Sequence, residues 1–348
     1  MKKFTKGCLL TALGLFVVGI ILFIAFGFLG GFAQLDNHTQ GEGGWSWPFK
    51  LYGSLNDVSD WREVFSDENG DLSDEIWGDD MKIDKAEWEK MTTLAEEKTK
   101  LTEGKDIRNI ELQIGACYFE LKASEDENIW IELSKKPDKT RYFVSGDTLK
   151  VVSRISVRHS NWGLNTNIPR VTLYLPEGME LENLDGQFGA GYFYMDAMKA
   201  QQVGINVGAG DCDIRSLEAK EADISSGAGN MDIGLLKTEK AAINVGAGDL
   251  TMERMEISDN LDFSIGMGHA DVKAGVIAGD ANLDCGMGDI VMSLEGSEAD
   301  YNSTIGCGMG TVQFGNSVFQ TGDHEINRGA AHTMDIDCGM GSVGIQFQ

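Results

Sequence analysis

The sequence is poor in several residue types on which common protein functions depend. Its 348 residues include only 4 prolines and 5 histidines, and 29 Lys and Arg stand against 55 Asp and Glu. Abundant glycine (44 residues) with so little proline argues against a collagen-like or disordered chain and favours tight corners between short strands. The net charge of −26 makes nucleic acid and anionic lipid headgroups poor partners, and it leaves cations and basic peptides as candidates.

Motifs that carry catalysis or metal binding are also missing from the sequence. There is no CxxC pair, HExxH, nucleophile elbow or phosphate-binding loop, and the histidines and basic residues are scattered. The Gly-x-Gly segments precede no helix, which argues against a dinucleotide site. We therefore expect no catalytic, cofactor-binding or metal-ligating residues, no evident small-molecule substrate and no enzymatic activity.

One long apolar run is present, from Leu9 to Phe32, and it contains no charged residue. It is long enough to span a bilayer as a helix, and Lys2, Lys3 and Lys6 precede it. The sequence predicts a single-pass cell-membrane protein, anchored through residues 9–32, with a cytoplasmic N-terminus and an extracytoplasmic C-terminal domain. Cleavage near Ala33 as a signal peptide is an open alternative.

Composition divides the chain into three predicted segments. Residues 1–33 form the cytoplasmic tip and transmembrane helix, 34–104 an acidic spacer or stalk, and 105–348 the folded domain. Within the spacer, an apolar stripe predicts a helix from Asp84 to about Lys100. The residues of that stripe are Trp88, Met91 and Leu94.

An internal repeat dominates the rest of the chain. A Gly-x-Gly corner recurs at steps of 19, 19, 19, 20, 20, 22 and 31 residues. Its first glycines are Gly189, Gly208, Gly227, Gly246, Gly266, Gly286, Gly308 and Gly339. An earlier, degenerate copy runs from Ile114 to Leu121, where Cys117 replaces the second glycine.

Apolar residues alternate with polar ones on both sides of each corner, as in half-buried strands. Val203, Ile205 and Val207 precede one corner, and Cys212 and Ile214 follow it. A strand, a corner and a second strand repeated about every 20 residues predict an all-β, parallel β-helix-like solenoid. Because neighbouring coils stack in register, equivalent residues should form internal columns.

Three of these columns have chemical alternatives. Cys285, Cys307 and Cys338 are expected to be small buried hydrophobes, with a thiolate metal site or a disulfide as the alternative. The middle corner residue changes from Ala to Met at Met267, Met287, Met309 and Met340, where gap-filling packing is favoured over a sticky stripe or a soft-metal site. Aspartates form exposed columns in which structural calcium is disfavoured and weak cation binding is a hypothesis. These are Asp211, Asp249 and Asp289, with Asp213, Asp232 and Asp271.

Four segments together resemble the bacterial "putative adhesin" family of unknown function. They are Ile110–Leu121, Val171–Leu184, the repeats from Ile205, and Asp323–Phe347. The resemblance implies a β-solenoid ectodomain behind one membrane helix, with no catalytic residues to transfer; some relatives resemble accessory proteins of envelope-stress systems.

The sequence and the resemblance together favour a non-catalytic cell-surface binding or scaffold module. A sensor or accessory protein of an envelope-stress response is the alternative, and a solenoid polysaccharide-active enzyme is less favoured. The expected partner is a cell-envelope protein or a cationic peptide.

Overall fold

The computed structural model describes residues 85–94, 98–134, 139–155 and 169–348, all within the compact unit Ile83–Gln348. The predicted membrane segment 9–32 and the spacer up to residue 84 lie outside the described residues. Within the described ranges, no helix is long and apolar enough to cross a membrane.

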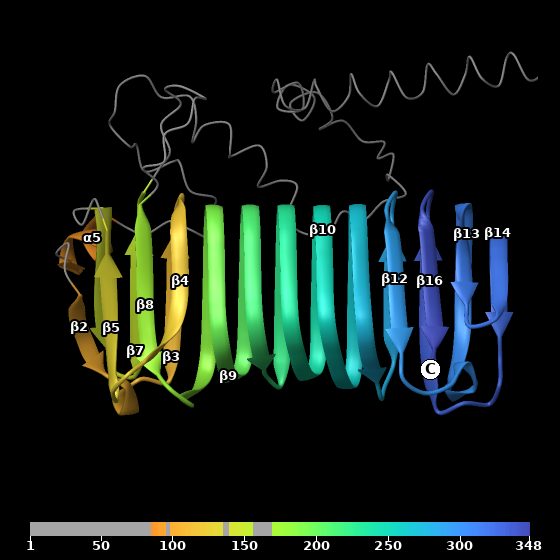
Figure 1. The fold of residues 1–348 in the computed structure, drawn as a ribbon, viewed down its shortest axis with the longest axis horizontal. Coiled ribbons are helices and arrows are strands. Elements are labelled where there is room, and N and C mark those ends of the chain that lie inside the picture. Colours follow the sequence, from red (N-terminus) through yellow and green to blue (C-terminus); the bar gives the residue numbers. More distant parts are fainter. Residues whose placement is uncertain (1–84, 95–97, 135–138, 156–168) are drawn as a thin grey trace, which may run out of the picture. The chain divides into compact units, whose positions relative to one another are not determined.

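The described chain is almost entirely β-structure (Figure 1). Before the first regular coils it forms α5 (Lys85–Lys90), β1 (Thr92–Thr93), β2 (Thr99–Glu103) and the 3₁₀ turn η3 (Gly104–Asp106). The next strands are β3 (Asn109–Ile114), β4 (Cys117–Ser124), β5 (Asn128–Leu133), β6 (Thr140–Ser145), β7 (Thr148–Ser153) and β8 (Arg170–Pro176). They are followed by β9 (Glu180–Glu218), β10 (Glu221–Ile277), β11 (Ala281–Cys285) and β12 (Asp289–Leu294). The C-terminal part holds the 3₁₀ turn η5 (Glu298–Asp300), β13 (Tyr301–Phe314), β14 (Ser317–Ile326), β15 (His332–Cys338) and β16 (Ser342–Phe347).

Parallel stacking of coils confirms the predicted all-β solenoid. Strand β10 pairs with β9 in parallel, and Ile224 lies beside Ile205 before the corner. After the corner, Ile233 lies beside Ile214. Strands β9 and β10 are long because extended, paired backbone continues through the corners of several coils. In Figure 1 these coils appear as parallel ribbons that lie side by side.

The core lies inside each coil, between the strand before the corner and the strand after it. Inward residues of both strands are buried, whereas the residues between them face outward. The predicted column just before the corner is confirmed, because every member is at most 6% exposed: Val207, Ser226, Val245, Ile265, Cys285, Cys338 and Cys307. Equivalent residues thus shield one another from water along the whole stack.

Glycine is required at the second corner position for two reasons. Gly210 has φ +125° and Gly229 has φ +123°, a conformation that side chains disfavour. A Cβ on Gly229 would also lie 2.7 Å from the carbonyl carbon of Gly210 in the preceding coil. The repeated glycine therefore permits both the corner and the close stacking of coils.

The order of coils in space differs from their order in the chain at both ends. At the C-terminal end, β15 lies between β11 and β13, and β16 lies between β12 and β13. The last coil of the chain is therefore inserted between the coil formed by β11 and β12 and the coil formed by β13. At the N-terminal end, β3 likewise lies between β7 and β9, and β4 lies between β8 and β9. The long final step of 31 residues, from Gly308 to Gly339, contains β14, which pairs antiparallel with β13.

Antiparallel strands terminate the stack at each end. Strand β14 pairs antiparallel with β13, and β6 and β5 pair antiparallel with β7 and β8. Such strands interrupt the parallel template that an open solenoid end would offer to another chain.

The predicted helix from Asp84 to Lys100 is wrong beyond Lys90. The chain turns after α5 into β1, which pairs with β6, and then into β2, which pairs with β5. The apolar stripe is used for packing, since Met91 and Leu94 are 5% and 4% exposed. Strand pairing with the end of the solenoid overrides the local helical pattern.

Candidate functional site

The three C-terminal cysteines share one buried column. Cys338 lies in register between Cys285 and Cys307, and the five cysteines among the described residues are all free thiols. Burial raises the pKa of Cys285 to about 12 and also raises the pKa of Cys307 and Cys338. Protonated, inward thiols are poor nucleophiles and poor ligands, so the prediction of small buried hydrophobes is confirmed.

Three of the four corner methionines are exposed. Met267, Met287 and Met309 are 40%, 42% and 76% exposed, and Met340 is partly buried. The favoured prediction that they fill gaps in the core is therefore wrong. The inward alternation changes phase at the corner, because Cys285 and Ile290, five residues apart, both face inward and Met287 is left outside.

The predicted aspartate columns lie on the outer face of the sheet that follows the corners. Asp213 and Asp232 are in register, and His269 lies beside Asp289. Asp289 accepts a hydrogen bond from the Ser342 hydroxyl. Across the described ranges, no three His, Cys, Asp or Glu side chains gather as a metal-binding group.

A second group of carboxylates forms on the sheet that precedes the corners. Asp284 and Asp337 are directly paired, and Asp337 and Asp323 flank Gly306 from opposite sides. Asp262 adjoins Asp284, and Asp335 adjoins Asp337. We call these five residues the acidic cluster: Asp262, Asp284, Asp323, Asp335 and Asp337.

Burial and like charge disfavour ionisation within the acidic cluster. The pKa of Asp284 is raised by burial and then by the charges of Asp337 and Asp262. The pKa of Asp337 is raised by burial and then by Asp335 and Asp323. Among the described residues, no Lys or Arg forms an ion pair with any member of the cluster. The cluster is consequently a concentration of uncompensated negative charge.

The sequence did not predict this cluster. It forms because the last coil is inserted beside β11, which brings Asp337 against Asp284, and because β14 folds back to present Asp323. The repeat period carries no sign of this insertion. Spacing alone suggested that coils follow one another in chain order.

Basic residues elsewhere on the solenoid pair with acids of the same or a nearby coil. Lys199 lies 2.6 Å from Glu218, and Arg215 lies 3.0 Å from Asp196. Arg254 contacts both Glu256, at 2.6 Å, and Glu295, at 2.9 Å. These bridges neutralise their own region and leave the acidic cluster uncompensated.

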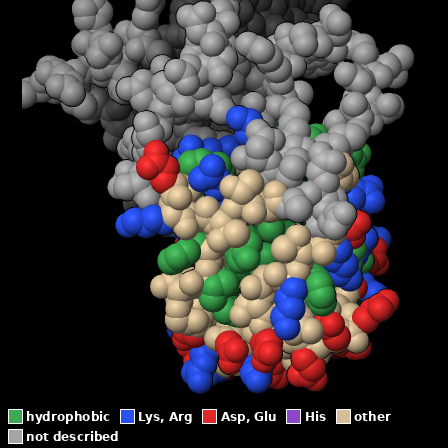
Figure 2. Space-filling view, turned by 90° about the vertical axis from the view of Figure 1, so that its left-hand side faces the viewer, with side chains coloured by type: hydrophobic (Ala, Val, Ile, Leu, Met, Phe, Trp, Pro, Cys, Tyr) green, Lys and Arg blue, Asp and Glu red, His purple; other side chains and the backbone are tan. Residues whose placement is uncertain are grey.

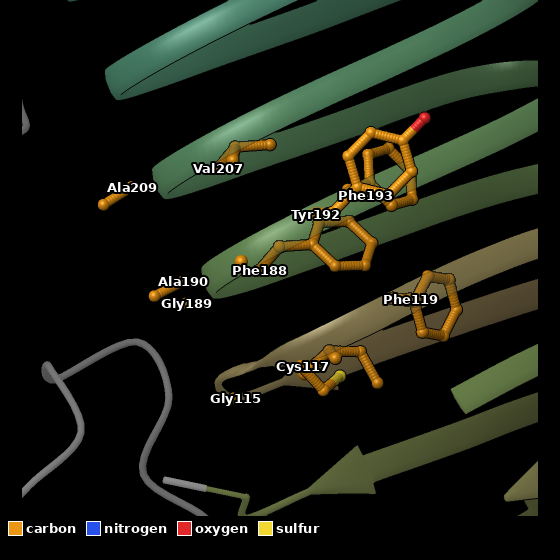
Figure 3. Close-up of a pocket in the computed structure, with 12 residues that line it drawn as sticks. Gly115, Cys117, Phe119, Phe188, Gly189, Ala190, Tyr192, Phe193, Val207 and Ala209 are labelled. Carbon is orange, nitrogen blue, oxygen red and sulfur yellow. The ribbon is translucent and has the colours of Figure 1, made fainter. Parts of the chain in front are cut away.

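A crevice opens at the corner edge near the start of the repeats (Figure 3). It is lined by Phe119, Phe188 and Phe193, with the Phe188 and Phe193 rings stacked at 4.0 Å between centroids. Its free volume is about 10 Å³, the least that one water molecule needs. The crevice has no room for a small-molecule substrate.

The opposite end of the stack from the acidic cluster has a different surface. Figure 2 faces the end that carries β2 and β5, where hydrophobic side chains lie amid uncharged groups and both acidic and basic side chains lie along the lower edge. The α5 helix is held at this end by Trp88, whose ring centre lies 4.5 Å from the guanidinium carbon of Arg141 and 4.2 Å from that of Arg154.

A family model described as Toastrack DUF4097 matches residues 107–345. No curated protein matches the chain. A crystal structure described as a "putative adhesin" from Bacteroides fragilis is 14% identical and covers 71% of this chain and 94% of its own, with a TM-score of 0.37. A "putative lipid binding protein" from Parabacteroides distasonis is 15% identical over 72% of this chain and 96% of its own, with a TM-score of 0.42. A "putative cell adhesion protein" from Clostridium sporogenes is 13% identical over 72% and 98%, with a TM-score of 0.23.

Proposed function

The chain belongs to the Toastrack DUF4097 family, and on this premise we propose that it is a non-catalytic binding or scaffold module held at the cell surface by residues 9–32. The resemblance drawn from the sequence motifs agrees with this family. The anchor and its orientation rest on the apolar run and the lysines before it.

The shape of the described surface supports binding rather than catalysis. The outward residues lie on flat parallel sheets, and the crevice near Phe188 is too small for a substrate. Enzymes require a convergent cleft with perturbed titrating groups near one another. The perturbed groups here are thiols buried in the core and carboxylates on a flat face.

The acidic cluster is the observation that carries the proposal. Five carboxylates in adjacent strands, without basic partners in the described chain, create a local negative potential on an exposed sheet. A Lys- or Arg-rich peptide would relieve their mutual repulsion. The expected partner is therefore a cationic peptide, or a basic segment of a cell-envelope protein.

A binding titration of the full-length chain in detergent tests this proposal. A fluorescent Lys-rich peptide should bind more weakly as salt is raised from low to physiological concentration, because exposed charges are screened. Asp284→Asn with Asp337→Asn should weaken binding by about threefold or more. The matched control is Asp211→Asn with Asp249→Asn, two exposed carboxylates on the other sheet.

Equal loss of binding in both double variants would show that net charge, and not the cluster, attracts the peptide. Absence of binding to wild type would remove the cationic-peptide partner. The same titration bears on the alternative role in an envelope-stress response, which the acidic cluster also favours as a receptor for cationic peptides. That role further requires that cells with Asp284→Asn and Asp337→Asn respond less to added peptide.

A further inference from the structure

We propose that the four corner methionines, three of them exposed and Met340 partly buried, form a binding site for a soft monovalent metal ion, Cu(I) or Ag(I). The site consists of Met267, Met287, Met340 and Met309, named here in their order along the stack. We call this group the methionine ladder.

Backbone hydrogen bonds fix the order and register of the ladder. The Met287 amide donates to the Gly266 carbonyl at 2.8 Å, and the Met340 amide donates to the Gly286 carbonyl at 2.8 Å. The Met309 amide donates to the Gly339 carbonyl at 2.7 Å. Each methionine therefore sits at the same corner position in one of four consecutive coils. The insertion of the last coil completes the series, since without Met340 a coil would separate Met287 from Met309.

The ladder is not explained by packing. Met252 and Met292 are fully buried, so this chain fills its core with methionine elsewhere and leaves the corner methionines outside. Four earlier corners carry alanine at this position: Ala190, Ala209, Ala228 and Ala247. The Met267 corner shares their backbone form, because its second glycine, Gly268, is left-handed like theirs. A bulky apolar side chain is thus unnecessary at the Met267 corner, and among the described corners methionine occupies this position only in the C-terminal half of the repeats.

The spacing of the ladder suits a metal bridging two thioethers. Equivalent atoms in adjacent strands lie about 4.8 Å apart. A metal–sulfur bond is about 2.3 Å long, so an ion between two sulfurs in line separates them by about 4.6 Å. When adjacent ladder side chains adopt the same conformation, their sulfurs are therefore spaced to bind one ion in line.

The chemistry of the ligands selects the class of ion. Thioether sulfur is a soft, neutral donor that favours Cu(I) over hard ions such as calcium or magnesium. It carries no proton at ordinary pH, so a metal need not displace one. The nearby thiols of Cys285 and Cys338 are buried on the inner side of the strand, so they do not belong to the ladder.

The decisive experiment compares the full-length wild-type chain with a quadruple variant in which each ladder methionine is replaced by leucine. Leucine keeps the apolar volume and removes the sulfur, so loss of binding cannot be attributed to lost hydrophobic surface. Cu(I) affinity is measured without oxygen, by competition with a chromophoric Cu(I) chelator. The control is Met252→Leu with Met292→Leu, which removes two sulfurs from the core.

We expect the quadruple variant to bind Cu(I) at least tenfold more weakly, and the control to match wild type. Wild-type affinity should be equal at pH 5 and pH 7, because thioethers do not titrate. With ¹³C-labelled methionine methyl groups, Ag(I) should shift only the ladder resonances among the 15 methionines of the chain. Unchanged affinity in the quadruple variant, a steep pH dependence, or shifts of the buried methionines would overturn the proposal.

Discussion

Replacing Gly248 by alanine should strongly destabilise the solenoid. Gly248 has φ +142°, and an added Cβ would lie 2.8 Å from the carbonyl carbon of Gly229 in the preceding coil. A left-handed conformation costs an L-residue about 1–2 kcal/mol, and overpacking a close contact costs about 1–3 kcal/mol more. We therefore expect Gly248→Ala to lower the free energy of unfolding by about 2–5 kcal/mol.

Three other glycines separate these two contributions. Gly246 has no left-handed φ, but its Cβ would lie 2.6 Å from the Gly227 carbonyl oxygen, so it reports crowding alone. Gly146 has φ +59° with nothing within 4 Å of an added Cβ, so it reports backbone strain alone. Gly204 has neither, and its replacement should change stability by less than about 1 kcal/mol.

Equilibrium urea unfolding, followed by far-ultraviolet circular dichroism, measures all four variants. The loss in Gly248→Ala should approach the sum of the losses in Gly246→Ala and Gly146→Ala. A loss no larger than that of Gly204→Ala would refute the argument that close coil stacking requires glycine at this corner.

Three further perturbations test other parts of the structure. The pKa of Asp284 and of Asp337 is raised above 3.8, so their stabilising effect is present below pH 3.8 and is lost as pH rises through the folded-state pKa. Asp284→Asn with Asp337→Asn should therefore raise the melting temperature at pH 7 but not below pH 3.8; an equal gain at both pH values would contradict this. Deleting residues 332–348 removes the coil that joins residues 301–326 to the stack. Limited proteolysis should then cleave residues 301–326 and spare the preceding coils. Continued protection of residues 301–326 would show that the last coil does not hold them in place. Trp88→Ala should lose about 1–2 kcal/mol of cation–π stabilisation and speed hydrogen exchange in α5, while Trp88→Phe should lose less; unchanged exchange would show that the ring does not hold the helix.

Local pattern was sufficient to predict the coil. The Gly-x-Gly period and the alternation around Ile205 and Ile214 predicted the strands, the corners and the inward columns, because each depends only on residues close in sequence. The thiol column was predicted for the same reason. The prediction that the ladder methionines fill gaps in the core failed. Cys285 and Ile290 both face inward although they are five residues apart, so the inward–outward alternation changes phase between them and leaves Met287 outside. Local pattern also failed after Lys90, where pairing between β1 and β6 displaced the expected helix.

Residues close together in the chain set the conformation of each coil, whereas contacts between distant segments set which coil lies beside which. All coils share one pattern of inward residues. A coil can therefore stack equally well on the next coil of the chain or on one further along the sequence, and the repeat does not show which. The insertion of residues 332–347 depends on strand pairing between segments that are distant in the chain. Forming these pairs costs loop-closure entropy, so local residue patterns do not determine them. The acidic cluster arises from that insertion, which also places Met340 between Met287 and Met309 in the methionine ladder. The sequence showed which residues share the ladder position but not their order in space.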